Sequence, residues 1–154
     1  MDIQTTRFGV VSITDEQLIT FPRGLIGFAK AADFALLAAP ANDGFYWLQS
    51  VIEPELAFLV TDPQPFFKDY DVPIREETQA DLQLADTKDG RLLVICNRVG
   101  EWLTGNLLGP LVINTATRQG QQVVLTEKKW TCRQPLMRLG AAEQGEPSGR
   151  LAAA

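Results

Sequence analysis

The stretch LTGNLLGPLVIN, residues 103–114, decides the fold of this chain, because it ends one strand and begins another. Proline has no backbone N–H to give to a β-ladder, so Gly109-Pro110 predicts a break between strands. The apolar run that follows the break stops at Asn114. The side chains of this stretch are apolar, amide or hydroxyl, with no strong base among them. We therefore expect the stretch to be architectural.

The residues on both sides of this stretch predict a sheet. The turn-like residues 115–120 and the apolar run at 122–126 predict a β-hairpin in which Gly120 supplies a permissive backbone. Upstream, short β-branched or aromatic runs alternate with Gly, Pro and Asn turns, including the turn signal at 42–44. Further strands are thus predicted at 3–7, 10–13, 18–21, 33–39, 46–51, 56–60 and 91–96, with a loop at 97–101 and a last exposed strand at 126–133.

One segment, residues 73–85, has the pattern of a helix. Its acidic first turn suits the helix macrodipole, and its apolar residues recur at helical spacing on one side. The acidic residues are Glu76 and Glu77, and the inward side is formed by Ile74, Thr78, Leu82 and Ala85.

About ten short strands and one short helix predict an all-β fold, a single barrel-like and mostly antiparallel sheet domain over residues 1–138. Residues 139–154 are rich in Gly, Ala, Pro and polar side chains, which predicts a disordered C-terminal tail. Large side chains are available to fill the barrel, so no cavity of ligand size is expected. They are Phe34, Leu48, Phe58 and Leu93.

Composition limits the class of protein. The chain has 154 residues, which is about one domain, and 45% of them are hydrophobic, which is typical of a folded protein. It contains no apolar run of about 18 residues and no basic N-terminal region before an apolar block. We therefore expect a cytoplasmic protein with no membrane partner.

The content of histidine and cysteine argues against metal and cofactor chemistry. The chain has no histidine, which removes the commonest zinc ligand and general base, and Cys96 and Cys132 are far apart in sequence. We expect Cys96 to be a small buried hydrophobe and Cys132 a second unpaired thiol. No metal site, no cofactor and no catalytic residue is predicted.

Charge is distributed unevenly along the chain. The net charge is −5, but residues 53–89 alone carry ten acidic residues against three basic ones, about −7, which leaves about +2 for the rest. Such a surface fits a basic protein partner and suits nucleic acid poorly, because phosphates need cations. The alternative is that these carboxylates form a solvated face. The basic residues around Trp130, namely Lys128, Lys129 and Arg133, are too few to predict an RNA site.

Residues 61–71 form the most unusual segment, with two prolines, three aromatic residues and three carboxylates. The prolines predict an edge or a loop, and aromatic residues beside charge are typical of a protein-binding surface. The alternative is that Phe66 and Phe67 divide between the core and a surface lid. The candidate partner-binding residues are Asp62, Pro63, Phe66, Phe67, Lys68, Asp69, Tyr70, Asp71, Glu76 and Glu77.

Five motifs in order carry a resemblance to a known family. They are FPRGLIGF (21–28), LQSV (48–51), LAFLVTDP (56–63), FFKDY (66–70), and NLLGPLVIN (106–114) with the following TRQGQQVVL (117–125). With this spacing the chain resembles the flagellar assembly factor FliW family over residues 3–136. The family tends to carry alanine at the position of Gly109.

The resemblance implies a small, barrel-like cytoplasmic protein that is not an enzyme. Members of that family bind the RNA-binding translational repressor CsrA and relieve its repression of flagellin mRNA, and they also bind flagellin. For this chain the resemblance implies a switch between these two protein partners, without direct contact to nucleic acid. The acidic segment is then expected to face the repressor and to repel RNA phosphate.

Three other functions are alternatives to the one that the resemblance implies. The nearest is a flagellin-secretion chaperone without an RNA-regulator partner. A carboxylate-based enzyme would need two carboxylates at a fixed separation in a cleft. A small-ligand barrel would need an open interior.

Overall fold

A computed structural model of the chain describes residues 1–39 and 44–139, and within them it shows eleven strands and one α-helix. The helix is α1 (Glu76–Asp81), and two short 3₁₀ turns lie at Asp15–Gln17 and Thr87–Asp89. The strands are β1 (Asp2–Thr5), β2 (Gly9–Ser12), β3 (Leu18–Thr20), β4 (Asp33–Ala38), β5 (Phe45–Ser50), β6 (Ala57–Thr61), β7 (Gly90–Val99), β8 (Trp102–Gly105), β9 (Leu111–Asn114), β10 (Gln119–Gln122) and β11 (Gln134–Arg138).

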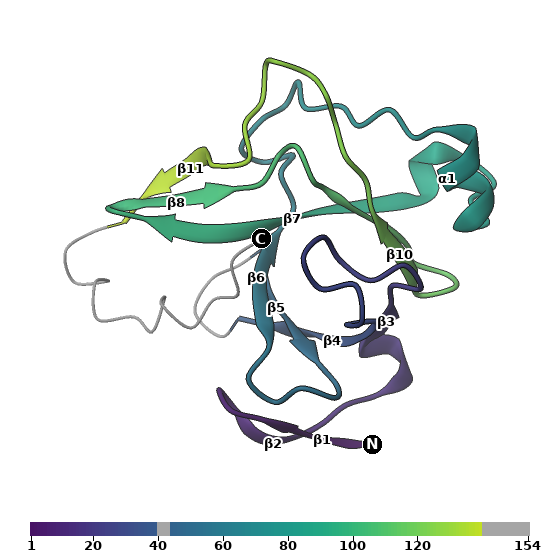
Figure 1. The fold of residues 1–154 in the computed structure, drawn as a ribbon, viewed down its shortest axis with the longest axis vertical. Coiled ribbons are helices and arrows are strands. Elements are labelled where there is room, and N and C mark those ends of the chain that lie inside the picture. Colours follow the sequence, from purple (N-terminus) through teal and green to yellow (C-terminus); the bar gives the residue numbers. More distant parts are fainter. Residues whose placement is uncertain (40–43, 140–154) are drawn as a thin grey trace.

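Seven strands close into a barrel. Their order is β7-β6-β5-β4-β3-β10-β9, and β9 pairs back onto β7 to complete the ring (Figure 1). The neighbours are antiparallel except at one junction, where Gln119 of β10 pairs in parallel with Thr20 of β3. The predicted all-β, barrel-like and mostly antiparallel fold is confirmed. The β1–β2 hairpin forms a separate two-stranded sheet below the barrel.

The strand break predicted at Gly109-Pro110 is the point where the barrel separates from an extension of the same sheet. Leu93 of β7 pairs with Leu111, and Cys96 pairs with Gly105. Residues 106–110 therefore loop out between β8 and β9, which both lie along the same edge of β7.

Beyond this break, the end of β7, β8 and β11 form a three-stranded sheet that projects from the barrel (Figure 1), which we term the wing. The prediction of a loop at 97–101 is wrong, because β7 continues to Val99. The chain then turns into β8 through Gly100, whose φ is 61°. β11 and the end of β7 are half-buried or exposed, so these residues lack the continuous apolar run that marked the barrel strands.

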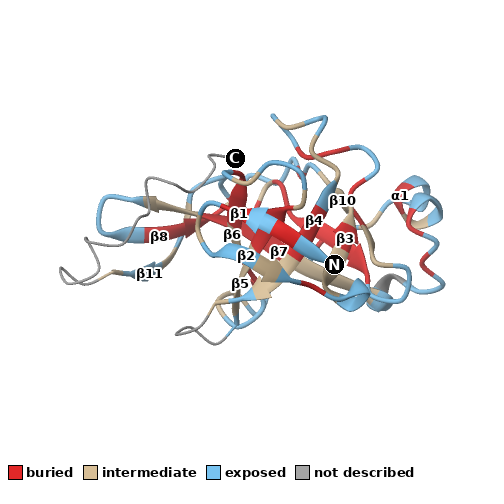
Figure 2. Ribbon diagram, turned by 90° about the horizontal axis from the view of Figure 1, so that it is seen from below, coloured by how far each residue is buried: buried red, intermediate tan, exposed pale blue. Residues whose placement is uncertain are grey.

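The barrel interior is filled by side chains. Phe34, Leu48, Phe58 and Leu93 are buried inside the barrel, as expected. Buried stretches, red in Figure 2, run through the barrel strands. Residues 21–28 add a lid, since Phe28 packs edge-on against Phe58 with ring centroids 5.3 Å apart. The inward residues of the barrel are Ile19, Phe34, Leu48, Phe58, Val60, Leu93, Ile95, Leu111 and Ile113.

A second apolar cluster lies on the outer face of β7 and β9, and we term it the outer cluster. Side chains alternate along a strand, so Val94 and Val112 point away from the interior that their neighbours fill. The segments that precede and follow the barrel strands cover them. The outer cluster contains Tyr70, Val72, Leu82, Leu84, Val94, Leu107, Val112, Leu125 and Trp130.

The predicted helix at 73–85 is too long at both ends. Arg75 is the N-cap residue, and Gln83 has a φ of 55°, so the helix ends before it completes two turns. This bend places both Leu82 and Leu84 in the outer cluster, whereas a continuing helix would turn them to nearly opposite sides. Ala85, expected on the inward side, is exposed.

Two details of the C-terminal half also differ from expectation. Gly120 lies inside β10 rather than in the turn, and Arg118 takes the left-handed conformation with a φ of 60°. Residues 126–133 are not a strand, and the last strand is β11. Residues 126–133 instead run across the outer cluster, where the side chain of Trp130 is buried.

Several expectations concern residues at the limits of the structure. The turn signal at 42–44 lies outside the described residues except for Gly44, and so does the predicted tail except for Leu139. The backbone N–H of Leu139 donates to the Glu101 carbonyl at 2.6 Å. Both cysteines have free thiols, with Cys96 buried and Cys132 exposed, which confirms their expected roles.

Candidate partner-binding surface

The acidic segment, residues 62–71, leaves β6 and crosses the outer cluster on its way to α1 (Figure 1). Local hydrogen bonds fix its first turn. The Gln64 N–H donates to Asp62 Oδ1 at 2.9 Å, and the N–H groups of Phe66 and Phe67 both donate to the Pro63 carbonyl at 3.0 Å. Pro63 is buried, so it supports the turn from beneath.

Tyr70 anchors the acidic segment to the stretch that breaks the strands. Its side chain is 2% exposed, and its phenol donates a hydrogen bond to the Leu107 carbonyl at 2.7 Å. Gln64 Nε2 donates in turn to the Tyr70 carbonyl at 2.8 Å. Burial raises the pKa of Tyr70, and the negative charge of Glu127 raises it further, so the phenol keeps its proton. Tyr70 therefore supports the surface and is not part of its exposed area.

Aromatic packing gives the acidic segment a rigid base. The rings of Phe67 and Tyr70 each lie 5.3 Å from that of Trp130, and Phe66 lies 6.2 Å from Phe45 of β5. Phe66 and Phe67 are both half-buried, so each packs on one side and meets solvent on the other. Phe67 packs against the outer cluster, whereas Phe66 packs against Phe45. Trp130 is 6% exposed and offers no free face on which a base could stack.

The charged side chains of the segment point outward. Asp69 forms an ion pair with Lys129, and both side chains are more than half exposed. The hydrogen bond from Lys129 holds the pKa of Asp69 below its ordinary value. Lys68 and Asp71 are exposed, and Asp62 is half-buried. The segment thus presents carboxylates over an apolar base.

The first turn of α1 adds two more exposed carboxylates, Glu76 and Glu77. The acidic segment and α1 are consecutive, and both pack onto the outer cluster, through Tyr70 and Leu82 respectively. Arg23 pairs with Asp81 at 2.7 Å and ties α1 to the loop at 21–28. The candidate residues therefore lie along one continuous stretch of chain, although Pro63 and Tyr70 lie beneath the surface.

Sequence reasoning missed Lys129 as a neighbour of this surface. Lys129 lies 60 residues from Asp69 in sequence and reaches it because Trp130 is buried beside Phe67 and Tyr70. The basic residues around Trp130 were considered only as an RNA patch. A single sequence does not indicate that a lysine pairs with an aspartate 60 residues away.

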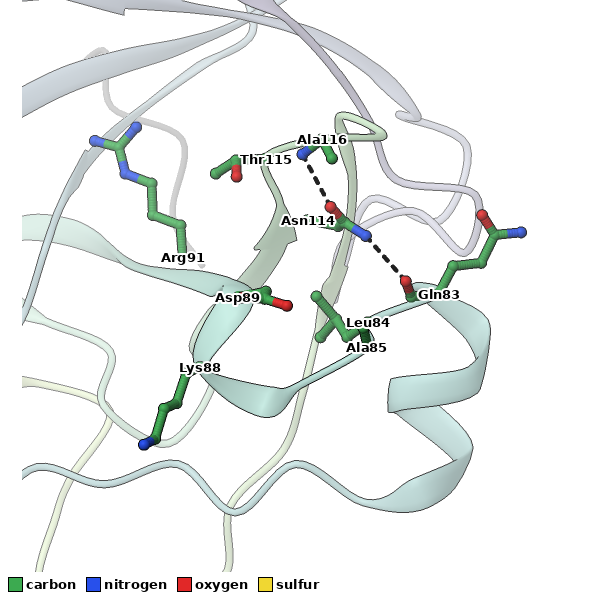
Figure 3. A pocket seen from close by; sticks show the side chains of 10 residues that line it. Gln83, Leu84, Ala85, Lys88, Asp89, Arg91, Asn114, Thr115 and Ala116 are labelled. Atoms are coloured by element: carbon green, nitrogen blue, oxygen red, sulfur yellow. Dashed lines mark hydrogen bonds between the residues drawn. The ribbon is translucent and has the colours of Figure 1, made fainter.

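An open depression of about 620 Å³ lies between the end of α1 and the β9–β10 turn (Figure 3). Its polar centre is Asn114, whose amide nitrogen donates to the Leu82 carbonyl at 2.8 Å and whose oxygen accepts from the Ala116 N–H at 2.9 Å. Lys88 and Arg91 point away in opposite directions (Figure 3). The amide of Asn114 thus joins the end of α1 to the β9–β10 turn. The charged residues that line the depression are of both signs, namely Lys88, Asp89 and Arg91.

Two further observations concern metals and membranes. No group of three or more Asp, Glu, Cys or His side chains suited to a metal ion occurs within residues 1–39 and 44–139. No helix in the described part of the chain has the length and apolar character needed to cross a bilayer.

A closed barrel that is filled by its own side chains and covered outside by connecting segments defines the chain as a small β-barrel protein. Comparison with known proteins gives a more specific assignment. The family model described as FliW protein matches residues 2–136. This chain belongs to the flagellar assembly factor FliW family.

Individual relatives agree with this assignment over nearly the whole chain. The flagellar assembly factor FliW of Heliobacterium modesticaldum is 37% identical, with 97% of this chain and 99% of that protein covered. The flagellar assembly factor FliW of Magnetococcus marinus is 36% identical, with 89% and 85% covered. A crystal structure of the flagellar assembly factor FliW superimposes with a TM-score of 0.80 at 31% identity, covering 89% of this chain and 97% of the other.

Proposed function

We propose that this protein binds a CsrA-type translational regulator in the cytoplasm, relieves its repression of flagellin mRNA, and also binds flagellin. The observation that carries the proposal is the row of exposed carboxylates on a rigid aromatic base, in a chain of the flagellar assembly factor FliW family. The finer steps, which are the identity of the two partners and their exchange, come from the family resemblance.

Charge supports the choice of an RNA-binding protein as a partner. A protein that binds RNA carries cationic groups for the phosphates, and those groups attract an acidic surface. Once bound, Asp69, Asp71 and their neighbours would lower the affinity of the regulator for RNA by repulsion. A coupling of about 1 to 3 kcal/mol, typical of linked sites, would weaken RNA binding by roughly 5- to 150-fold.

Preorganisation supports the same surface. The Asp62 turn, the Tyr70–Leu107 hydrogen bond and the Trp130 contacts hold the acidic segment in one shape before any partner arrives. A segment that is already ordered loses less conformational entropy on binding. The half-exposed rings of Phe66 and Phe67 add apolar contact area beside the charges.

Titration calorimetry against the CsrA-type regulator of the same organism, with and without flagellin, tests the proposal. Binding that flagellin abolishes is the expected result for a partner switch. Binding to flagellin with no binding to the regulator would instead leave a flagellin-secretion chaperone. No binding to either partner would contradict the proposed function.

A charge-neutralised variant tests the surface. Replacing four carboxylates by amides should weaken regulator binding about tenfold or more at low salt, and less at high salt. The variant is Asp69→Asn, Asp71→Asn, Glu76→Gln and Glu77→Gln.

A matched control loses the same four charges at exposed positions away from the acidic segment. It is Asp15→Asn, Glu16→Gln, Glu53→Gln and Glu55→Gln. This control should bind the regulator within about threefold of the wild type. Equal weakening in both variants would show that net charge matters and that this surface does not.

A further inference from the structure

The acidic surface already holds a basic side chain of its own. Lys129 Nζ forms an ion pair with Asp69 Oδ2, although 60 residues separate the two in sequence. The same ammonium group lies 5.0 Å from the centroid of the Trp130 ring. The ion pair therefore occupies a defined position on the candidate surface.

Buried neighbours determine that position. Trp130 follows Lys129 and is buried against Tyr70, which follows Asp69. The backbones that carry the two charges are thus held together by packing beneath them. The charges themselves remain at the surface, with the Lys129 side chain 58% exposed and that of Asp69 63% exposed.

Such a pair can be exchanged at small cost. An exposed ion pair contributes little to stability, because water solvates both charges well when they separate. Another ammonium or guanidinium group that reaches Asp69 can therefore replace Lys129. The Lys129 side chain can move into solvent, since within the described residues its ammonium group is held by the Asp69 ion pair and by its position over the Trp130 ring.

We propose that Lys129 is an internal competitor for the basic partner, occupying in the free protein the carboxylate that a cationic side chain of the partner takes in the complex. The inference rests on the proposed function, because it concerns regulation of the same surface. Lys129 lowers the affinity for basic partners in general. Only a partner that also makes further contacts displaces it, so the ion pair adds selectivity.

The other charges nearby define the control. Lys68 and Asp71 flank Asp69 in sequence, and Lys128 and Glu127 precede Lys129. Lys128 is exposed and forms no ion pair within the described residues. Lys128→Gln removes the same positive charge one residue away and leaves the Lys129–Asp69 pair intact. Lys129→Gln removes the pair and keeps part of the aliphatic stem beside Trp130.

The first measurement needs no partner. Carbon NMR titration of the carboxyl groups should show that the pKa of Asp69 rises in Lys129→Gln and stays near the wild-type value in Lys128→Gln, since the Lys129 hydrogen bond is the main cause of its lowering. Equal shifts in both variants, or none in either, would overturn the inference, because Lys129 would then not occupy Asp69 in solution.

The second measurement is the affinity of the full chain for two basic probes, the CsrA-type regulator and a hexalysine peptide. At low salt, Lys129→Gln should bind each probe about two- to fivefold more tightly than Lys128→Gln does, and this ratio should approach one at about 1 M salt. Equal affinities of the two variants, or weaker binding by Lys129→Gln, would overturn internal competition.

The two probes separate failure of the inference from failure of the proposed function. If the regulator binds wild type but does not distinguish the variants, the function stands and the inference is wrong. If the regulator fails to bind any form while hexalysine distinguishes the variants, Lys129 does mask Asp69 and the proposed partner is wrong. If hexalysine does not distinguish them either, both are wrong.

Discussion

At the scale of single residues, two glycines near the strand break differ in their tolerance for a side chain. A Cβ at Gly120 would lie 2.6 Å from Phe21 Cε1, a ring atom that is fixed in the barrel interior. The atoms nearest to a Cβ at Gly109 would be the amide nitrogens of Asn106 and Gln122, each at 2.9 Å. Neither glycine has a positive φ, so the difference between them lies in what surrounds them.

Gly120→Ala should therefore lower the free energy of unfolding by about 1 to 3 kcal/mol, the range for overpacking a core. Gly109→Ala should lower it by less, about 1 kcal/mol, because the groups that must shift are side-chain amides, and the cost is the weakening of the hydrogen bond from Gln122 Nε2 to the Gly109 carbonyl. Urea denaturation of both variants measures the two values. A larger loss in Gly109→Ala than in Gly120→Ala would contradict the proposed packing.

Tyr70 couples stability to pH. Tyr70→Phe keeps the ring contacts with Trp130 but leaves the buried Leu107 carbonyl without its donor, so the free energy of unfolding should fall by about 1 to 2 kcal/mol at neutral pH. Because burial raises the pKa of the folded phenol above its ordinary value of 10.0, the folded state holds this proton more tightly than the unfolded state does. The phenol's contribution is therefore complete below pH 10 and is lost as the pH rises toward the folded pKa.

Denaturation of wild type and Tyr70→Phe at a series of pH values tests this coupling. The stability advantage of wild type should be constant up to about pH 9 and should shrink above about pH 10. Tyr46 is present in both proteins, so it cancels from the difference. An advantage that stayed constant through the alkaline range would show that the Tyr70 pKa is not raised.

At the scale of elements, α1 shows where sequence reasoning succeeded and where it stopped. The acidic first turn and the inward Thr78 and Leu82 were predicted from spacing, and the structure has both. The end of the helix was not, because it depends on Leu84, which leaves the helical pattern to reach the outer cluster. Helical periodicity predicts which residues share one face of a helix. It does not predict a bend after the helix that buries both Leu82 and Leu84.

Asn114 holds this short element to the barrel. Its amide nitrogen donates to the Leu82 carbonyl, and its oxygen accepts from Ala116 in the β9–β10 turn. Asn114→Ala should lower the free energy of unfolding by about 1 to 3 kcal/mol, because a buried carbonyl loses its partner. Hydrogen exchange should speed up in residues 76–84 more than in β6. Thr115→Ala, an exposed neighbour, should change stability by less than about 0.5 kcal/mol.

The wing was missed for a different reason. Val99 and Trp102 are exposed across a two-residue turn, and Asn97 and Arg98 interrupt the apolar pattern of β7. Strand prediction depends on one buried face, and this sheet is solvated over much of its surface. The pairing of β8 with β7 and β11 is therefore known from the structure and not from the sequence pattern.

At the scale of the whole molecule, the chain's interior was predictable and its outer layer was not. Phe34, Leu48, Phe58 and Leu93 were expected inside and are inside, because each is a large apolar side chain within a strand that the local sequence predicts. The outer cluster joins Tyr70 to Leu107 and Trp130, and the Asp69–Lys129 pair lies above it. Those contacts join segments far apart in the chain, so no local pattern encodes them.

Truncation tests where the folded domain ends. A chain ending at residue 139 should unfold at the same temperature as the full chain, because residues 140–154 offer little apolar surface to bury. A chain ending at residue 133 lacks β11 and should be less stable. Leu136 of that strand packs at Gly105, where a Cβ would lie 3.3 Å from Leu136 Cδ1. The loss should be at least about 1 kcal/mol, roughly half of what full burial of a leucine gives.

Calorimetric melting of the three chains separates the two boundaries. Exposure of Val94 and Gly105 should also make the shortest chain more prone to associate, because the removal of β11 leaves β8 as a new sheet edge. Sedimentation measures that tendency directly. Equal melting of the chains that end at 139 and 133 would show that β11 adds nothing to the domain, and a lower melting temperature on removal of 140–154 would place the end of the domain beyond the wing.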